Sequence, residues 1–352
     1  MPRLRRVDCS EKGITRRRRG RGFEYRDADG ERVDDPEVLR RIDALGIPPA
    51  WQDVWICPIP NGHLQATGMD AAGRKQYLYH EEWRRRRDTE KFRDMVAFAH
   101  DLPVLRERVV ADLASGREPT RERVLACAVR LLDRGFFRVG TAEYAAQNDS
   151  YGLATMHKRH VRIEGDDTMV FDFPAKSGVR RVQAVVDPEA VDLVARLKRR
   201  RGGSPELLAY KAGGRWHDVR SDDVNAYIKQ ATGGDHSAKD FRTWNATVLA
   251  AMALAVAGEV AATKTGRKRA ITRAVKEVSH YLGNTPAVCR ASYIDPRVFD
   301  AYRAGVIIRP ALEAASETAP GDLPNQHHAV EEAVLDLLGD RKRAPGLERV
   351  AA

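Results

Sequence analysis

The chain has 352 residues, of which 43% are hydrophobic and 31% are charged, and it carries a formal net charge of +10. This composition excludes a wholly disordered chain, and the length allows two domains with hydrophobic cores. The basic excess favours a polyanionic partner, and nucleic acid is the leading candidate. Three basic runs contribute to it, each of which alone is typical of a solvated surface: Arg16 to Arg19 with Arg21, Arg84 to Arg87, and Lys198 to Arg201.

Neither a metal site nor a membrane span is expected. His157 and His160 have the spacing of two metal ligands, but no partner ligands lie close to them in sequence. The longest apolar run, residues 246–258, is shorter than the roughly 20 residues of a membrane span and predicts a buried helix. We therefore expect a soluble cytoplasmic protein with reduced thiols. Its cysteines stand far apart, without a CxxC pair: Cys9, Cys57, Cys127 and Cys289.

The N-terminal part of the chain is predicted to be β-rich. Residues 1–20 are basic without an apolar core, which indicates a disordered tail rather than a secretory signal. Residues 21–98 are predicted to form a small, mostly β, DNA-binding domain. Its expected elements are a hairpin at 22–33 with its turn at Asp29-Gly30, a helix at 36–45, and strands at 54–58, 63–68 and 75–80. A charged helical stretch at 81–100 would lead into the second domain.

Helices dominate the second predicted domain, residues 99–312. The apolar spacing predicts helices at 103–114, 119–133, 188–200, 221–231, 239–259 and 267–282. Three strands at 161–164, 168–173 and 179–186 interrupt them, with a further strand-like piece within 207–219. A C-terminal tail, residues 313–352, contains one amphipathic helix at 330–338. The predicted fold class is therefore α+β.

One stretch, Leu282 to Pro296, carries a tyrosine near the end of a short helix. Gly283 can end the preceding helix, Thr285 can cap the next, and Pro296 disfavours helical geometry at the residue before it. Tyr293 would thus lie where the short helix stops. Alone, this pattern is more typical of a packing tyrosine than of a reactive one.

Attack of a tyrosine on a DNA phosphodiester would need assistance. The phenol has an unperturbed pKa near 10, and negative charge grows on the phosphate oxygens in the transition state. Arginines can stabilise that charge, and a lysine can protonate the leaving oxygen. Four residues occur where they could be presented to such a site: Arg138, Lys176, Arg242 and Asn284. Taken singly, they are more typical of ion pairs for the arginines, a solvated turn for the lysine and a helix cap for the asparagine.

Five blocks, in order along the chain, resemble those of type IB DNA topoisomerases of the small poxvirus-like and bacterial kind. They are Gly68–Asp70 with Gly73–Tyr79, Phe136–Gly140 with Tyr144 and Tyr151–Thr155, Ala175–Gly178, Lys239–Ala246, and Gly283–Tyr293. The resemblance spans roughly residues 20 to 310. Any one block would be a weak signal, but five in the right order make a chance agreement improbable.

The resemblance implies an enzyme that relaxes positive and negative supercoils. Tyr293 would form a 3′-phosphotyrosyl bond, Arg138 and Arg242 would hold the scissile phosphate, and Lys176 would protonate the leaving oxygen. It further implies a monomeric clamp around double-stranded DNA in the nucleoid, without ATP, metal or other cofactor. The residues expected to contact DNA are Gln76, Tyr77, Tyr79, Tyr144 and Lys239.

One position departs from the family pattern. Poxvirus-type members have histidine nine residues before the tyrosine, where this chain has Asn284. Asparagine can donate a hydrogen bond to a phosphate oxygen but cannot carry a proton or a positive charge. The donor role is therefore expected to survive, and any acid–base role at this position is not.

Two other functions remain open from the sequence. A tyrosine recombinase uses similar catalytic residues, but its second arginine usually follows histidine in a His-x-x-Arg pattern, where this chain has Lys239. A non-catalytic DNA-binding protein could present the same basic surface. Trapping a covalent protein–DNA adduct would distinguish it from the two enzymes.

Overall fold

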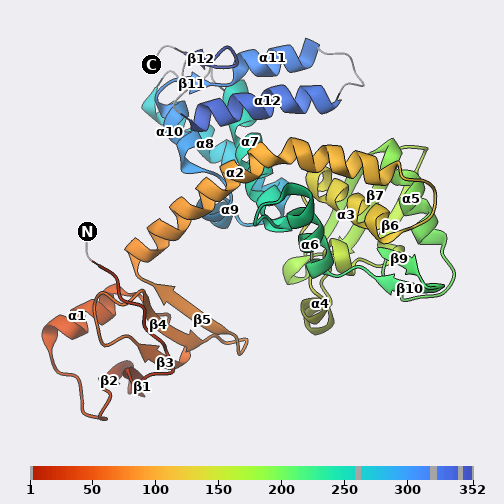
Figure 1. Ribbon diagram of the computed structural model, residues 1–352. Coiled ribbons are helices and arrows are strands. Elements are labelled where there is room, and N and C mark those ends of the chain that lie inside the picture. Colours follow the sequence, from red (N-terminus) through yellow and green to blue (C-terminus); the bar gives the residue numbers. More distant parts are fainter. Residues whose placement is uncertain (1–2, 258–262, 318–322, 340–343, 351–352) are drawn as a thin grey trace. The chain divides into compact units, whose positions relative to one another are not determined.

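The computed structural model describes residues 3–257, 263–317, 323–339 and 344–350. The chain forms two compact units, Met1–Lys91 and Phe92–Ala352, each described by itself below (Figure 1). A β-sheet unit followed by a mainly helical unit confirms the predicted α+β class. The predicted division of the chain after residues 20, 98 and 312 stays a prediction, as does the clamp.

The first unit is built on an antiparallel five-stranded sheet in the order β2-β1-β3-β4-β5. Its elements are β1 (Ile14–Arg19), β2 (Gly22–Arg26), α1 (Pro36–Ala44), β3 (Gln52–Ile56), β4 (Leu64–Met69) and β5 (Lys75–Tyr79). A small core, comprising Ile14, Ile42, Val54, Ile56 and Ala66, lies between the sheet and the helix. The predicted helix and three of the predicted strands are thus present within a few residues of their expected bounds.

The prediction of a disordered basic tail is wrong for residues 14–19, which form β1. Arg16 donates to the carbonyls of Ile47, Pro48 and Trp51 at 3.3, 3.0 and 2.7 Å, and its guanidinium lies 4.2 Å from the ring centre of Phe23. A run of arginines resembles a solvated segment in sequence, but here one of them binds the backbone of a loop. The predicted hairpin at 22–33 also differs, because β2 pairs mainly with β1.

A long helix, α2 (Glu81–Leu113), begins in the first unit and continues into the second. The sequence predicts two helices divided before Pro103, and this prediction is wrong. A proline inside a helix removes one backbone hydrogen bond and costs about 3 kcal/mol. Apolar side chains on both sides of it, from Met95 and Phe98 to Leu105 and Val109, are buried in the core. Their burial offsets that cost and keeps the helix continuous.

The remaining elements of the second unit surround α3 (Arg121–Gly135) and α7 (Ala238–Val256). The three-stranded sheet β6 (Val161–Glu164), β7 (Thr168–Pro174) and β8 (Arg180–Val186) is confirmed. The predicted end of α7 at residue 259 lies outside the described residues. Further elements are α4 (Ala142–Asn148), α5 (Pro188–Arg199), β9 (Ala209–Ala212), β10 (Arg215–Asp218), α6 (Ser221–Thr232), α8 (Lys264–Leu282), α9 (Pro286–Ser292), α10 (Pro296–Arg303) and β11 (Val306–Ile307).

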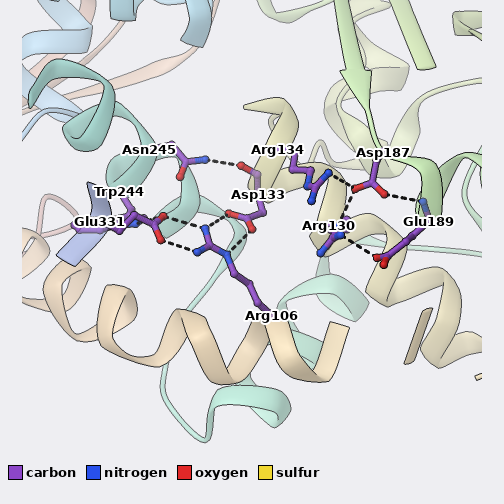
Figure 2. Close-up of polar contacts among 9 residues, drawn as sticks. All are labelled: Arg106, Arg130, Asp133, Arg134, Asp187, Glu189, Trp244, Asn245 and Glu331. Atoms are coloured by element: carbon purple, nitrogen blue, oxygen red, sulfur yellow. Dashed lines mark hydrogen bonds and ion pairs between the residues drawn. The ribbon is translucent and has the colours of Figure 1, made fainter. Parts of the chain in front are cut away.

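The C-terminal segment packs on this unit through α11 (Arg309–Glu317), α12 (Leu323–Leu338) and β12 (Glu348–Arg349) (Figure 1). Glu331 of α12 accepts hydrogen bonds from Arg106 of α2 at 2.6 and 2.9 Å and from the indole of Trp244 on α7 at 3.0 Å. Arg106 also binds Asp133 of α3 at 2.8 and 3.0 Å (Figure 2). A single carboxylate therefore connects α12 to the helices at the centre of the unit.

The Glu331→Gln substitution is expected to destabilise the second unit. An amide presents two N–H donors and one oxygen, so one donor would face the Arg106 guanidinium, which can only donate. The expected loss is about 1–3 kcal/mol in the free energy of unfolding, the usual effect of an unpaired buried polar group. Urea unfolding of the full chain, followed by circular dichroism, measures it.

Glu332→Gln is the matched control, because Glu332 is the next residue and its side chain is 64% exposed beside His328. A surface ion pair contributes at most about 1 kcal/mol, so the control should change stability little. Equal losses in the two variants would contradict the role assigned to Glu331.

Candidate active site

Four of the five predicted catalytic residues come together in the second unit: Arg138, Arg242, Asn284 and Tyr293. Each is contributed by a different segment, so the site depends on how these segments are held. Lys176, the fifth, lies on a hairpin tip and is described separately below.

Arg138 lies in the loop that follows α3. The helix ends where Phe136 adopts a left-handed conformation with φ 51°. The backbone carbonyl of Arg138 then accepts from the Leu153 amide at 2.8 Å. Gly140 and Gly152 let the two arms of the loop touch, since a Cβ added to Gly152 would lie 2.5 Å from the Cα of Gly140. The two glycines thus fix the path of the chain that carries the arginine.

Arg242 joins three segments. It lies in the second turn of α7, and only 4% of it is exposed. Nη1 donates to the carbonyl of Phe136 at 2.7 Å, and Nη2 donates to the carbonyl of Leu282 at 2.9 Å. Its Nε is buried without a hydrogen-bond partner in the described part of the chain. The guanidinium therefore ties the loop after α3 to the end of α8, and its Nε–H remains a buried donor without a partner.

Asn284 follows the end of α8, where Gly283 caps the helix in a left-handed conformation with φ 60°. Its backbone N–H donates to Ser279 at 3.0 Å, and its side-chain Oδ1 accepts from Nη2 of Arg138. Arg138 also donates to the carbonyl of Gly283 at 3.1 Å. Because Oδ1 faces a donor, the amide group Nδ2 points elsewhere, and it is buried without a partner among the described residues. It is a second donor that only a bound acceptor would satisfy.

Tyr293 caps the end of α9, as the sequence predicts. The helix begins at Thr285, whose hydroxyl accepts from the Val288 amide at 3.3 Å, and the Tyr293 amide donates to Cys289 at 3.0 Å. The guanidinium carbon of Arg242 lies 5.2 Å from the centre of the tyrosine ring. The phenol is thereby held beside the arginine by a side-chain cap at the start of a seven-residue helix and a backbone hydrogen bond at its end.

The charges around Tyr293 favour its ionised form. Burial by itself would raise the pKa of the phenol, but the positive charges of Arg242, Arg138 and Lys239 outweigh it and lower the pKa below its ordinary value. Conversely, burial and the neighbouring charge of Arg138 lower the pKa of Arg242 to about 10. Within the described ranges, no carboxylate forms an ion pair with either arginine. The cluster thus retains an unneutralised positive charge, as an anion-binding site would.

Lys176 lies at the tip of the β7–β8 hairpin, as predicted, and its side chain is exposed. Its Nζ is 6.0 Å from the ring centre of Tyr144, a half-buried residue of α4. In the described residues, no hydrogen bond or ion pair joins Lys176 to Tyr293 or to the two arginines. Its part in the site stays a prediction.

The predicted DNA contacts of the first unit occupy two faces of β5. Tyr77 and Tyr79 are 47% and 40% exposed and stack with their ring centres 6.2 Å apart. Gln76 directly precedes Tyr77 in the strand, so its side chain points to the opposite face, where its amide donates to Asp70 at 2.9 Å. Contact of any of the three with DNA stays a prediction.

Sequence reasoning did not identify Arg181 of β8, whose Nη2 donates to the carbonyl of Tyr281 in the last turn of α8. Nothing in its local sequence distinguishes it from the arginines around it. In the described residues there is no group of three histidine, cysteine or acidic side chains able to hold a metal. A search of the same residues found no helix with the length and hydropathy of a membrane span.

Comparison with known proteins gives two family matches. Residues 80–304 match the family model described as eukaryotic DNA topoisomerase I, catalytic core, and residues 22–70 match that of the bacterial DNA topoisomerase IB N-terminal domain. DNA topoisomerase 1B of Acanthamoeba polyphaga mimivirus is 30% identical over 300 residues, which are 83% of this chain and 88% of the relative. DNA topoisomerase 1 of Schizosaccharomyces pombe is 29% identical over 159 residues, 45% of this chain and 18% of that protein.

Replacement of Arg242 by methionine is expected to raise the pKa of Tyr293, because it removes the largest of the charges that oppose burial and leaves only those of Arg138 and Lys239. Ultraviolet absorbance is followed during a pH titration of the wild type and of its Tyr293→Phe variant. The difference between the two curves isolates the ionisation of the Tyr293 phenol. Its midpoint should lie below the ordinary value of about 10 in the wild type and above the wild-type midpoint in Arg242→Met.

Lys176→Met serves as the control, since its ammonium group contacts Tyr144 instead. This variant should leave the Tyr293 midpoint unchanged. Identical midpoints with and without Arg242 would show that the arginine does not set the ionisation of the phenol.

Proposed function

The chain belongs to the type IB DNA topoisomerases, an isomerase family, and we propose that it relaxes positive and negative supercoils by cutting and resealing one DNA strand through Tyr293. The observation that carries this proposal is a tyrosine of lowered pKa beside two arginines that no described carboxylate neutralises. A phosphodiester is an anion of the size and charge that two such arginines bind.

Cleavage exchanges one phosphate ester for another. The Tyr293 oxygen attacks the phosphorus, a 3′-phosphotyrosyl bond forms, and the bond to the 5′ oxygen breaks. The phenol releases its proton to solvent water as it attacks, which the charge of Arg242 favours. Lys176 supplies a proton to the leaving 5′ oxygen, so that a free hydroxyl results. After strand rotation, that hydroxyl attacks the phosphotyrosine and reverses every step.

The arginines act on the transition state. Arg138 and Arg242 hold the two non-bridging oxygens, where negative charge grows as phosphorus becomes five-coordinate. Their N–H groups are already fixed by backbone carbonyls and by Asn284, so little reorganisation is needed when the substrate arrives. The unpaired donor of Asn284 completes the set by donating to one of these oxygens.

No external energy source is needed in this scheme. The phosphotyrosyl ester conserves the bond energy of the broken phosphodiester, so resealing requires neither ATP nor metal. We further propose that the protein acts on duplex DNA as a monomer in the nucleoid, with Tyr77, Tyr79, Tyr144 and Lys239 contacting the DNA. Gln76 would first have to leave Asp70.

Purified protein is expected to relax supercoiled plasmid in EDTA without ATP, because the chemistry uses only side chains. Agarose gel electrophoresis of positively and negatively supercoiled plasmid measures the activity. Tyr293→Phe should abolish relaxation while leaving DNA binding intact, since it removes only the nucleophilic oxygen.

Relaxation that persists in Tyr293→Phe, or none in the wild type, would contradict the proposal. Denaturation during the reaction should trap a covalent adduct with the protein on the 3′ end. A non-catalytic DNA-binding protein would give no adduct, and a recombinase would also exchange strands between two specific sites.

Asn284→Ala is expected to slow cleavage far less than Arg242→Ala. The amide contributes one hydrogen bond to a charged oxygen, which corresponds to about 1.5–3 kcal/mol, whereas the arginine contributes charge and two anchoring bonds. Single-turnover cleavage of a labelled duplex compares the two rates. Equal losses would mean that the amide does more than donate.

Asn284→His provides a complementary test of the same position. Histidine titrates near pH 6.5, so this variant should gain a step in its pH–rate profile that the wild type lacks. Identical profiles would indicate that residue 284 does not touch the reacting phosphate.

A further inference from the structure

A third arginine reaches the turn that precedes the nucleophile helix. Arg181 lies on β8, five residues after the hairpin lysine Lys176, and its side chain is half-buried. Its Nη2 donates to the carbonyl of Tyr281 and to Oε1 of Gln183, the latter at 3.0 Å. Its Nε and Nη1 donate no hydrogen bond to any residue that the structure describes. Three N–H groups of this guanidinium are therefore available.

The turn itself leaves room for this guanidinium. A Cβ added to Gly283 would lie 2.5 Å from Nη1 of Arg181, closer than any real contact. The backbone of Gly283 also has φ 60°, which disfavours other residues. Glycine at this position thus serves both the end of α8 and the approach of Arg181. The arginine comes to lie beside the residue that precedes Asn284.

Arg181 differs from several inward-facing arginines of the second unit in having no acidic partner among the described residues. Arg106, Arg130 and Arg134 are each paired with carboxylates at 3.0 Å or less. No ion pair with a described carboxylate is formed by Arg138, Arg181 or Arg242. Burial and the charge of Arg138 lower the pKa of Arg181 to about 10, which indicates that the two guanidinium groups are close enough to repel.

Three unneutralised arginines at one turn exceed what a single phosphate requires. Two forked guanidinium groups already provide enough donors for the non-bridging oxygens of the scissile phosphate. Like charges held together without a counter-ion destabilise the folded chain, and binding of a polyanion would relieve that cost. A DNA strand carries its next phosphate one nucleotide away, within reach of a cation beside the first site.

We propose that Arg181 binds a phosphate of the cleaved strand that neighbours the scissile phosphate. This inference rests on the proposed function, because it assumes that DNA occupies the site of Arg138 and Arg242. The free Nε and Nη1 donors hold the phosphate while Nη2 stays on the Tyr281 carbonyl. Arg181 thus fixes the position of the DNA strand relative to the turn that carries Asn284.

Salt dependence of binding tests the contact directly. The full chain with Tyr293→Phe binds a fluorescent duplex without cutting it, and anisotropy gives Kd at several salt concentrations. Each phosphate contact adds about 0.9 to the slope of log K against log salt, so Arg181→Met should lower the magnitude of that slope by about 0.9. Its Kd at a given salt concentration should rise at least about tenfold, because the charge-assisted hydrogen bonds from Nε and Nη1 are both lost.

Three further variants separate charge from structure. Arg181→Lys keeps the charge and should restore the slope, while Arg181→Gln can still donate to Tyr281 and should behave like Arg181→Met. Arg180→Met is the matched control, because Arg180 is the preceding residue, is 75% exposed and is paired with Asp172 at 2.6 Å. It should leave the slope nearly unchanged. Thermal unfolding of every variant identifies any that fail to fold.

The proposal is overturned if Arg181→Met and Arg181→Gln keep the wild-type slope, or if Arg180→Met lowers it equally. Failure of the proposed function would look different. A wild-type chain that binds DNA with this dependence on Arg181 yet never relaxes plasmid would contradict the topoisomerase activity and leave the phosphate contact standing.

Discussion

The site depends on how Arg242 uses its hydrogen bonds. Its two terminal nitrogens donate to the carbonyls of Phe136 and Leu282, which are neutral groups. A carboxylate partner would have anchored the side chain equally well but would have cancelled its charge. Because the anchors are carbonyls, the positive charge remains available to the phenol of Tyr293, and the pKa of that phenol falls. The same two bonds also bring together the loop after α3, the helix α7 and the end of α8.

Such a site lowers the stability of the folded chain as long as no ligand is bound. Two buried donors, Nε of Arg242 and Nδ2 of Asn284, have no partner among the described residues, and each costs about 1–3 kcal/mol. The repulsion between neighbouring arginines adds to this. The large apolar core of the second unit, in which Phe98, Phe241 and Trp244 are almost wholly buried, offsets that strain. The apolar side chains of α7 therefore contribute to the stability of the unit, while Arg242 on the same helix serves the site.

Much of this arrangement follows from local signals in the sequence. Gly283, Thr285 and Pro296 bound the short helix and place Tyr293 at its end, and the hairpin that carries Lys176 follows from its strand and turn residues. The predictions that failed concern residues whose structure is set by contacts with distant parts of the chain. Arg16 looks solvated in sequence but binds loop carbonyls, and Pro103 looks like a helix boundary but lies inside the continuous helix α2. Arg181 was missed because only the fold brings its strand to the turn at Tyr281.

The contact between Glu331 and Trp244 places part of the support for Arg242 outside the region that defines the family. The family match ends at residue 304, whereas Glu331 lies on α12 and touches α7 two residues beyond the arginine. A premature stop codon or a protease cut between these points would leave every site residue in the chain. It would nevertheless remove the contact between Glu331 and Trp244 that helps to hold α7, the helix that carries Arg242. For truncated homologues, the presence of the reactive residues alone is therefore a poor guide to whether the enzyme works.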